Sequence, residues 1–83
     1  MEVKIGEVDD FFAKVGVAAF KVEGDFAVGD TIHIKGHTTD ITQTVDSMQI
    51  DHKPMQNAKK GDSVGIKVKD HARKGDVVYK VTA

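Results

Sequence analysis

The chain has 83 residues, no cysteine, one proline and a formal net charge of −1. This length allows one small domain, residues 1–83, and excludes a catalytic domain joined to a separate substrate domain. The lack of cysteine excludes disulfides and cysteine-ligated zinc or iron–sulfur sites. An isoelectric point near 6.4 argues against nucleic-acid binding through bulk charge alone. The sequence has no 18-residue apolar run and no secretory signal at its start, so we expect a cytoplasmic protein without a membrane partner.

Alternating apolar residues between glycines predict β-strands. Glycine occurs eight times and leaves few windows long enough for a helix. Ile32 and Ile34 alternate with polar residues, and the same period of two recurs over 64–68 and 77–81. Residues 15–22 are apolar on both faces, which is typical of a central strand. We therefore expect six strands, near residues 2–10, 15–23, 30–36, 40–52, 62–69 and 76–82.

Three Gly-Asp pairs precede predicted strands, at Gly29-Asp30, Gly61-Asp62 and Gly75-Asp76. Glycine adopts the positive φ that a tight turn needs, and an aspartate side chain can accept a hydrogen bond from the turning backbone. We expect the same turn chemistry at all three places.

Residues 37–60 are the ambiguous window of the sequence. Some of its apolar residues fall at helical spacing, but its threonines and Pro54 favour a strand. Over 40–52 the inward face changes phase between Val45 and Met48, and such a change needs one extra residue. We expect a β-bulge near Asp46–Ser47, with a helix as the alternative. The predicted inward residues are Ile41, Gln43, Val45, Met48 and Ile50.

Short strands separated by turns are typical of an all-β barrel, and closure of a barrel removes exposed sheet edges. We expect a small closed six-stranded antiparallel β-barrel. Ile34 and Ile66 should face its interior, and most of the aromatic residues should fill it.

The sequence shows no pattern that supports catalysis. The four histidines lack the helical spacing and the glutamate of a zinc-binding HExxH motif, and no nucleophile elbow or phosphate-binding glycine loop is present. We therefore expect no enzyme, no cofactor, no metal and no nucleotide triphosphate as ligand. A metal-dependent enzyme that uses His33, His37 or His52 remains the alternative.

Charge is distributed unevenly along the chain, with a net −4 over residues 1–40 and +3 over residues 41–83. One interpretation is a basic face that meets an acidic partner; the other is that both halves interleave in one barrel and the imbalance averages out. The residues of the expected basic face are Lys53, Lys59, Lys60, Lys67, Lys69, Arg73 and Lys74.

Four segments in register resemble the second domain of translational GTPases. Residues 26–36, Phe-Ala-Val-Gly-Asp-Thr-Ile-His-Ile-Lys-Gly, resemble the family's L-x-x-G-D-x-I-x-I-x-G stretch, and residues 44–50 follow it. Within residues 54–66, the run from Ala58 to Ile66 is similar to A-x-x-G-D-x-V-G-I, and residues 73–78 are similar to the closing x-x-G-D-V-L. The resemblance covers nearly the whole chain, best from 15 to 81. The chain is also similar to stand-alone translation elongation factor-like proteins and to the C-terminal barrel of U32 peptidases.

This resemblance implies a barrel of the translation-factor domain-2 type, as in elongation factor Tu and initiation factor 2, without the GTPase domain. In elongation factor Tu the barrel helps to hold the aminoacylated end of tRNA. The resemblance therefore implies a binding module that contacts RNA such as tRNA, the ribosome or a translation protein. Gln49 and Ser63 match the family's contact motifs, in place of a glutamate and an asparagine. Together with neighbouring basic positions, the candidate binding residues are Gln49, His52, Lys53, Ser63, Lys67 and Lys69.

The similarity to U32 peptidases implies a second function, that of a protein–protein accessory module. Such a module would dock to another polypeptide through an apolar patch near Phe11, Phe12 and Phe26. We expect one of these partners, an RNA or a protein.

Overall fold

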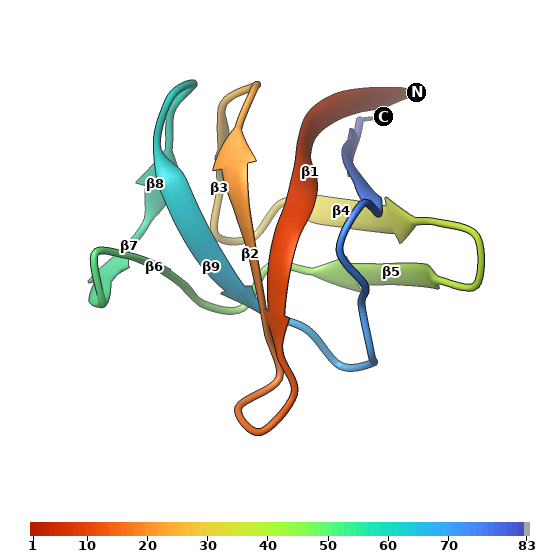
Figure 1. Cartoon of the computed structure of the whole chain (residues 1–83). Helices are drawn as coiled ribbons and strands as arrows, with labels where there is room; N and C mark the ends of the chain where they lie inside the picture. The colour runs from red at the N-terminus through yellow and green to blue at the C-terminus, as the bar shows by residue number, and fades with distance from the viewer. Residues whose placement is uncertain (83) are drawn as a thin grey trace.

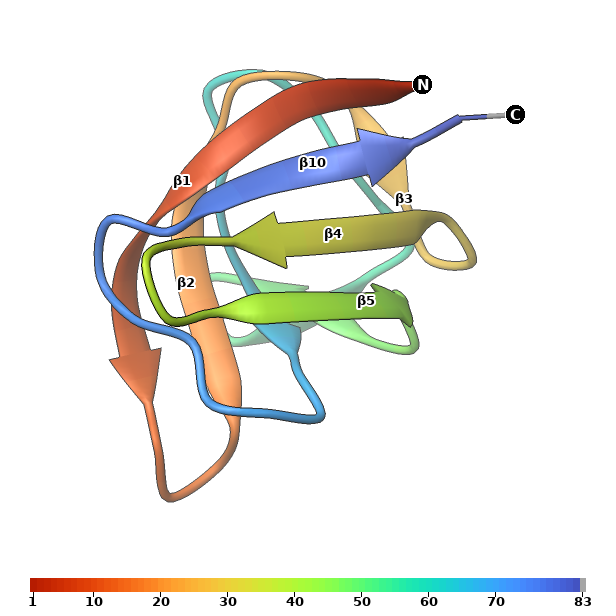
Figure 2. The same cartoon turned by 90° about the vertical axis from the view of Figure 1, so that its right-hand side faces the viewer.

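The protein is built around one strongly curled antiparallel sheet. The computed structural model describes residues 1–82. The main sheet has eight strands in the order β5–β4–β10–β1–β2–β9–β6–β7, and β3 pairs with β8 in a separate two-stranded sheet. Figures 1 and 2 show the strong curl of the main sheet. The strands are β1 (Glu2–Phe12), β2 (Val17–Val22), β3 (Phe26–Ala27), β4 (Thr31–Lys35), β5 (Asp40–Thr44), β6 (Met48–Ile50), β7 (Lys53–Met55), β8 (Asn57–Ala58), β9 (Ser63–Lys67) and β10 (Val77–Val81).

The all-β class is confirmed, but the predicted closed six-stranded barrel is wrong. The two edge strands of the main sheet, β5 and β7, do not pair with each other, so the sheet stays open. The strand expected over 40–52 is in fact two strands. β5 pairs with β4 at one end of the sheet, and β6 pairs with β9 near the other end.

A corner at Val45 explains why this segment splits. The Val45 amide donates to the Asp30 carbonyl at 2.9 Å, and the Gly29 amide donates to the Val45 carbonyl at 2.9 Å. These bonds tie the chain to the turn before β4, and the chain then crosses to β9, where the Ser47 carbonyl accepts a bond from the Lys67 amide at 3.4 Å. The predicted change of phase is therefore real, but it marks a corner between two strands and not a bulge near residues 46–47.

One side chain bridges part of the opening that the corner leaves. Gln43 on the edge strand β5 donates from Nε2 to the Lys67 carbonyl at 2.8 Å. Its Oε1 accepts a hydrogen bond from the Lys69 amide, also at 2.8 Å. A single amide side chain thus replaces the backbone pairing that a closed barrel would have made here. This contact explains why Gln43 shares an inward-facing position with apolar neighbours.

The core lies on the concave face of the sheet. Ile34 and Ile66 are both 0% exposed, which confirms their predicted orientation. Within residues 1–82 no helix has the length and apolar character needed to cross a membrane, and none forms over 37–60. The buried apolar side chains are Ile5, Val8, Ala18, Phe20, Val22, Phe26, Ile32, Ile34, Ile41, Val45, Met48, Ala58, Val64, Ile66, Val68, Ala72 and Val78.

The three Gly-Asp turns have the predicted chemistry. The glycines have φ values of 99°, 99° and 96°. In each turn the aspartate carboxylate accepts a hydrogen bond from the amide three residues earlier, at 2.8–3.0 Å. The aspartate amide donates in return to the carbonyl of that same residue. A positive φ at the third position is the requirement of a type II turn, which only glycine meets at little cost.

The irregularities of the sheet lie in β1 and not where the sequence predicted a bulge. The pairing of β1 with β10 shifts between Lys4 and Gly6, and its pairing with β2 shifts between Val8 and Asp10. Bulges bend a strand and increase its twist, so β1 can pair with both β10 and β2 in a strongly curled sheet. The strands β3, β7 and β8 were not predicted, because runs of two or three residues give no periodic signal.

Candidate functional site

A groove crosses the convex face of the sheet over β2 and β9. Its floor is made of small side chains, because Ala19 lies opposite Gly65 in the strand pairing and Val17 is next to them. Phe12 and Val15 form one wall at the β1–β2 hairpin, and the cavity has a volume of about 750 Å³. This volume lies in the range of ligand-binding pockets. We call this cavity the β2–β9 groove.

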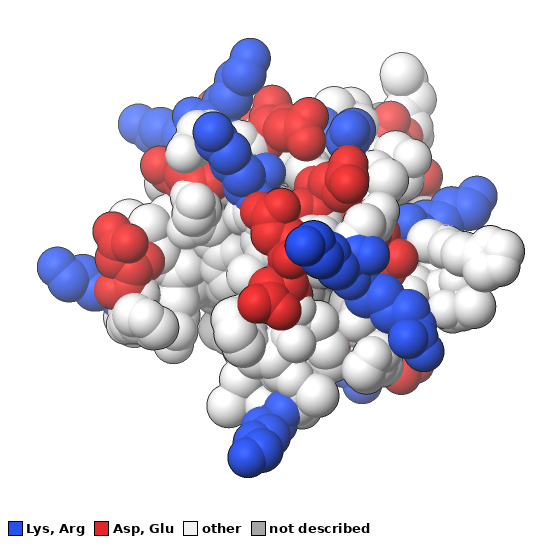
Figure 3. Space-filling view, viewed as in Figure 1, with Lys and Arg blue, Asp and Glu red and all other residues white. Residues whose placement is uncertain are grey.

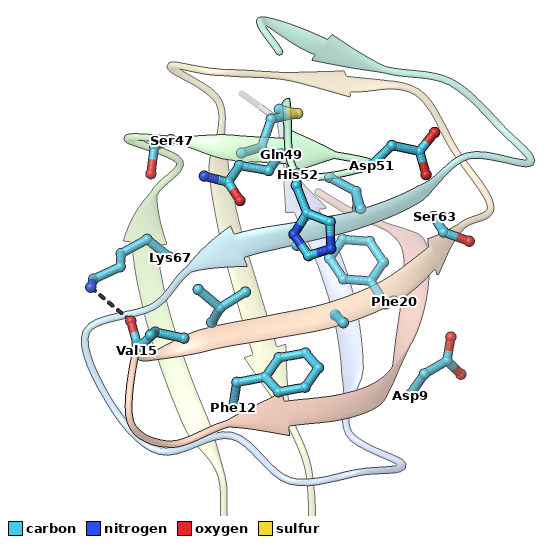
Figure 4. Close-up of a pocket in the computed structure, with 15 residues that line it drawn as sticks. Asp9, Phe12, Val15, Phe20, Ser47, Gln49, Asp51, His52, Ser63 and Lys67 are labelled. Atoms are coloured by element: carbon cyan, nitrogen blue, oxygen red, sulfur yellow. Dashed lines mark hydrogen bonds between the residues drawn. The ribbon is translucent and has the colours of Figure 1, made fainter. Parts of the chain in front are cut away.

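The second wall of the β2–β9 groove comes from β6 and the turn that follows it. Gln49 pairs with Gly65 of β9, so its side chain stands on the same convex face. Asp51 and His52 form the two-residue turn between β6 and β7, with φ values of 53° and 62°. Two consecutive positive φ values define a type I′ turn, in which asparagine and glycine are the favoured residues. Figure 4 shows the His52 ring directed into the groove toward the Phe12 ring.

The two ends of the β2–β9 groove differ in charge. Asp9, Asp51 and the hydroxyl of Ser63 lie along one end, while Lys67 lies at the other (Figure 4). Lys67 Nζ donates to the Val15 carbonyl at 2.7 Å, which holds the ammonium group at its own end. Within residues 1–82 neither acidic side chain forms an ion pair. In Figure 3 an uncharged, hollowed area over β9 lies between two groups of acidic side chains.

The structure brings together four of the six candidate residues predicted from the sequence. Gln49, His52, Ser63 and Lys67 all line the β2–β9 groove, whereas Lys53 and Lys69 do not. Lys53 is exposed on the edge strand β7, and the backbone of Lys69 belongs to the bridge made by the Gln43 side chain. The predicted basic face remains a prediction, and in Figure 3 basic side chains interleave with acidic ones over the visible surface.

Sequence reasoning missed the residues that give the groove its shape. Ala19 and Gly65 had appeared only as members of strands, yet their small size creates the hollow. Asp9 lies at the β1 bulge between Val8 and Asp10, and a bulge redirects a side chain. The two positive φ values of the β6–β7 turn gave no sequence signal, because Asp-His is not a common pair for that turn.

The apolar patch expected near Phe11, Phe12 and Phe26 does not form. Phe26 is 3% exposed and its ring stacks on Phe20 in the core, at a centroid distance of 5.8 Å. Phe11 packs against the core and meets the His71 ring edge-on. Phe12 alone among these three points outward, because successive strand residues face opposite sides of the sheet.

Apart from the groove, a polar cluster of Glu2, His33 and Asp40 lies across β1, β4 and β5. His33 Nδ1 lies 2.7 Å from Glu2 Oε2, and His33 Nε2 lies 2.6 Å from Asp40 Oδ1. The hydrogen bond to Asp40, supported by the one to Glu2, raises the pKa of His33 above its usual value. The arrangement links three strands by charge-assisted bonds. It is a structural bridge, since both ring nitrogens already have partners.

The alternative of a histidine-based metal enzyme gains no support from the geometry. In residues 1–82 no three histidine or acidic side chains are grouped so that they could hold a metal ion. A smaller polar cavity of about 330 Å³ is lined by Thr39, Asp40, Asp70, His71 and Arg73 among others. The Thr39 hydroxyl is buried beside it without a hydrogen-bond partner within the described part of the chain.

Comparison with known proteins links the chain to peptidases. It is 46% identical over 79 residues to an uncharacterised protease of Methanocaldococcus jannaschii, which covers 94% of this chain and 19% of that protein. It is 33% identical over 81 residues to a collagenase of Porphyromonas gingivalis, covering 95% of this chain and 20% of that protein. The chain thus spans about a fifth of the length of the curated relatives it matches. No protein-family model matches the sequence.

The fold is that of a domain found in U32 peptidases. The C-terminal domain of a Geobacillus thermoleovorans protein assigned to the U32 peptidases superposes with a TM-score of 0.87 at 20% identity, covering 94% of this chain and 91% of that one. The selenomethionine form of the same domain gives a TM-score of 0.86 at 19% identity, covering 92% and 96%.

These comparisons bear on two predictions. The expectation that the chain is no enzyme is contradicted, because the sequence relatives are named as a protease and as collagenases. The predicted similarity to the U32 barrel is supported, while the resemblance to translational GTPases receives no support from these relatives. The match covers nearly all of this chain but only one region of each relative. The chain is therefore similar to a domain of U32-type peptidases.

Proposed function

We propose that this chain is a polypeptide-binding domain that serves a U32-type peptidase. The β2–β9 groove carries this proposal, since it combines an apolar floor, two opposed rings and exposed polar groups in one cavity. Phe12 and Val15 are 50% and 54% exposed, so the groove presents apolar surface to solvent. Exposed apolar surface that surrounds a concave site is typical of interaction sites.

The expected role is to hold a polypeptide substrate near the peptidase centre. The groove opens to solvent, so an extended chain can lie across β2 and β9 with one or two side chains on the small-residue floor. A binding domain connected to a catalytic domain raises the effective concentration of substrate there. The names of the sequence relatives suggest denatured collagen as a polypeptide with which to begin.

The test is binding of unfolded polypeptides to the isotope-labelled protein, followed by backbone amide shifts. Gelatin fragments and unfolded casein should shift the amides of Val17, Ala19 and Gly65, and bulk tRNA serves as the competing ligand. Val15→Ser should weaken binding by about fivefold or more, because it removes an apolar contact at the wall. Val3→Ser is the matched control, since Val3 is 47% exposed on the same sheet but outside the groove.

Two results would contradict the proposal. Amide shifts that appear with tRNA but with none of the polypeptides would indicate that the chain binds nucleic acid instead. Equal losses in Val15→Ser and Val3→Ser would show that polypeptides bind through apolar surface in general and not through the groove.

A further inference from the structure

We propose that the β2–β9 groove selects polypeptide segments by a basic side chain, arginine being the best fit. This inference rests on the proposed polypeptide-binding function and adds to it the chemistry of the preferred ligand. It identifies Asp9 and Asp51 as the residues that determine specificity. The occupant is an extended segment whose arginine lies over the apolar floor and reaches the acidic end.

Charge complementarity is the first argument. Asp9 on β1 and Asp51 on the β6–β7 turn come from opposite walls and lie at the same end of the cavity (Figure 4). No lysine or arginine in residues 1–82 pairs with either carboxylate. Lys67 also lines the groove, but its ammonium group is held 2.7 Å from the Val15 carbonyl at the opposite end. A ligand cation is thus attracted to one end only.

The shape of the groove is the second argument. Between its two ends, the Phe12 ring from one wall and the His52 ring from the other face the same space (Figure 4). A guanidinium group stacks on flat rings and also forms paired hydrogen bonds with carboxylates. Its aliphatic stem packs on apolar surface while the charged head stays wet. Val17 and Ala19 supply that surface, and Asp9 with Asp51 receives the head.

The β6–β7 turn is the third argument. Asp51 and His52 both have positive φ values, which are uncommon for residues with a side chain. Asn-Gly would make the same turn at lower conformational cost. The turn instead holds one acidic group and one ring at the wall of the groove, and unfavourable backbone conformations of this kind occur preferentially where side chains bind ligands. The conformational cost is understandable if both side chains contact the bound segment.

The experiment compares two synthetic peptides that differ only in charge. Each is acetylated and amidated, with the sequence Gly-Leu-Xaa-Gly-Ser, where Xaa is arginine or its neutral isostere citrulline. The arginine peptide should bind about five- to tenfold more tightly than the citrulline peptide at low salt, as measured by amide shifts. This preference should shrink as salt is added, because partly exposed ion pairs are screened.

A double variant separates specificity from folding. Asp51→Asn with His52→Gly builds the favoured Asn-Gly turn, so the protein should remain at least as stable to heat. We expect its preference for arginine over citrulline to fall to about twofold or less, since one carboxylate and one ring are gone. Asp70→Asn is the matched control: it removes the same charge outside the groove, its amide oxygen can still accept from the His71 amide, and the preference should stay.

The outcomes distinguish this inference from the proposed function. Equal binding of both peptides at the groove, or an unchanged preference in the double variant, would overturn the arginine selectivity and leave polypeptide binding in place. No binding of either peptide, of gelatin or of casein would overturn both.

Discussion

The two ends of the curled sheet differ in how many residue pairs join their neighbouring strands. At one end, β4 pairs with β10 and with β5 over five residue pairs each, and the His33 ring links three strands on the outside. At the other end, β6 pairs with β9 at two positions and with β7 at three. The floor of the groove lies on β2 and β9, which pair at five positions, and the second wall of the groove comes from the sparsely paired end. Because β6 makes few backbone pairs with its neighbours, this part of the chain can form the wall of a binding groove.

The largest expected effect comes from removing a core side chain at each end. Ile34→Ala at the well-paired end and Ile66→Ala at the groove end should each lower the free energy of unfolding by about 2–5 kcal/mol, because both side chains are fully buried. We expect Ile66→Ala at the lower part of this range, since the open end can relax into the space that is left. Urea unfolding followed by circular dichroism measures both values. A larger loss for Ile66→Ala would show that the groove end is as rigid as the other.

A glycine in the middle of the sheet and a glycine at the groove end give the next comparison. A Cβ on Gly6 would lie 2.2 Å from Phe20 Cδ2 and 2.9 Å from the Lys21 carbonyl oxygen, so Gly6→Ala should cost about 1–3 kcal/mol of stability. A Cβ on Gly65 would meet only Val17 Cγ1, at 3.0 Å. Gly65→Ala should therefore change stability by less than about 1 kcal/mol, yet weaken polypeptide binding because it raises the groove floor. Thermal unfolding and peptide titration of both variants measure the contrast. Similar destabilisation by the two changes would contradict it.

This contrast also explains how far the sequence could predict the molecule. Period-two alternation correctly placed Ile34 and Ile66 in the core, and the Gly-Asp pairs correctly predicted three turns. Both signals are local, so one sequence is enough to show them. The corner at Val45 depends on hydrogen bonds to Gly29 and Asp30, which lie far away in the chain. Alternation alone could not distinguish such a corner from a bulge. The sequence therefore predicted one continuous strand over 40–52 and, with it, a closed barrel.

The candidate site was predictable in part for the same reason. Gln49, His52 and Ser63 were selected from a resemblance to another family and Lys67 from the basic stretch after residue 40. They share the groove because β6 pairs with β9. The acidic end is contributed by Asp9 and Asp51, which are distant in sequence and line the same end of the groove only when the sheet curls. No local pattern of the sequence predicts that arrangement. The charge balance of the groove is a property of the folded sheet.

A smaller effect is expected where one side chain bridges the two ends. Gln43→Leu removes the bonds to the Lys67 carbonyl and to the Lys69 amide, so it should lower the free energy of unfolding by about 1–2 kcal/mol. Gln43→Glu keeps the acceptor for the Lys69 amide but places a carboxylate against the Lys67 carbonyl. Amide hydrogen exchange of 67–69 should accelerate in both variants. Unchanged exchange there would show that the bridge contributes nothing to holding the ends together.

The smallest effect is the pH dependence of the well-paired end. The carboxylates of Asp40 and Glu2 raise the pKa of His33 in the folded protein, so the protonated ring stabilises the fold. That stabilisation is complete below the unfolded pKa of about 6.5 and is lost as the pH rises through the higher folded pKa. A neutral ring can donate only one hydrogen bond, and one carboxylate then loses its donor. The difference in melting temperature between the native protein and His33→Gln should therefore be largest near pH 5.5 and shrink by about pH 8. A difference in melting temperature that grows with pH would mean that the neutral ring is the stabilising form. Titration of His33 should not change binding at the groove, because His33 does not line it.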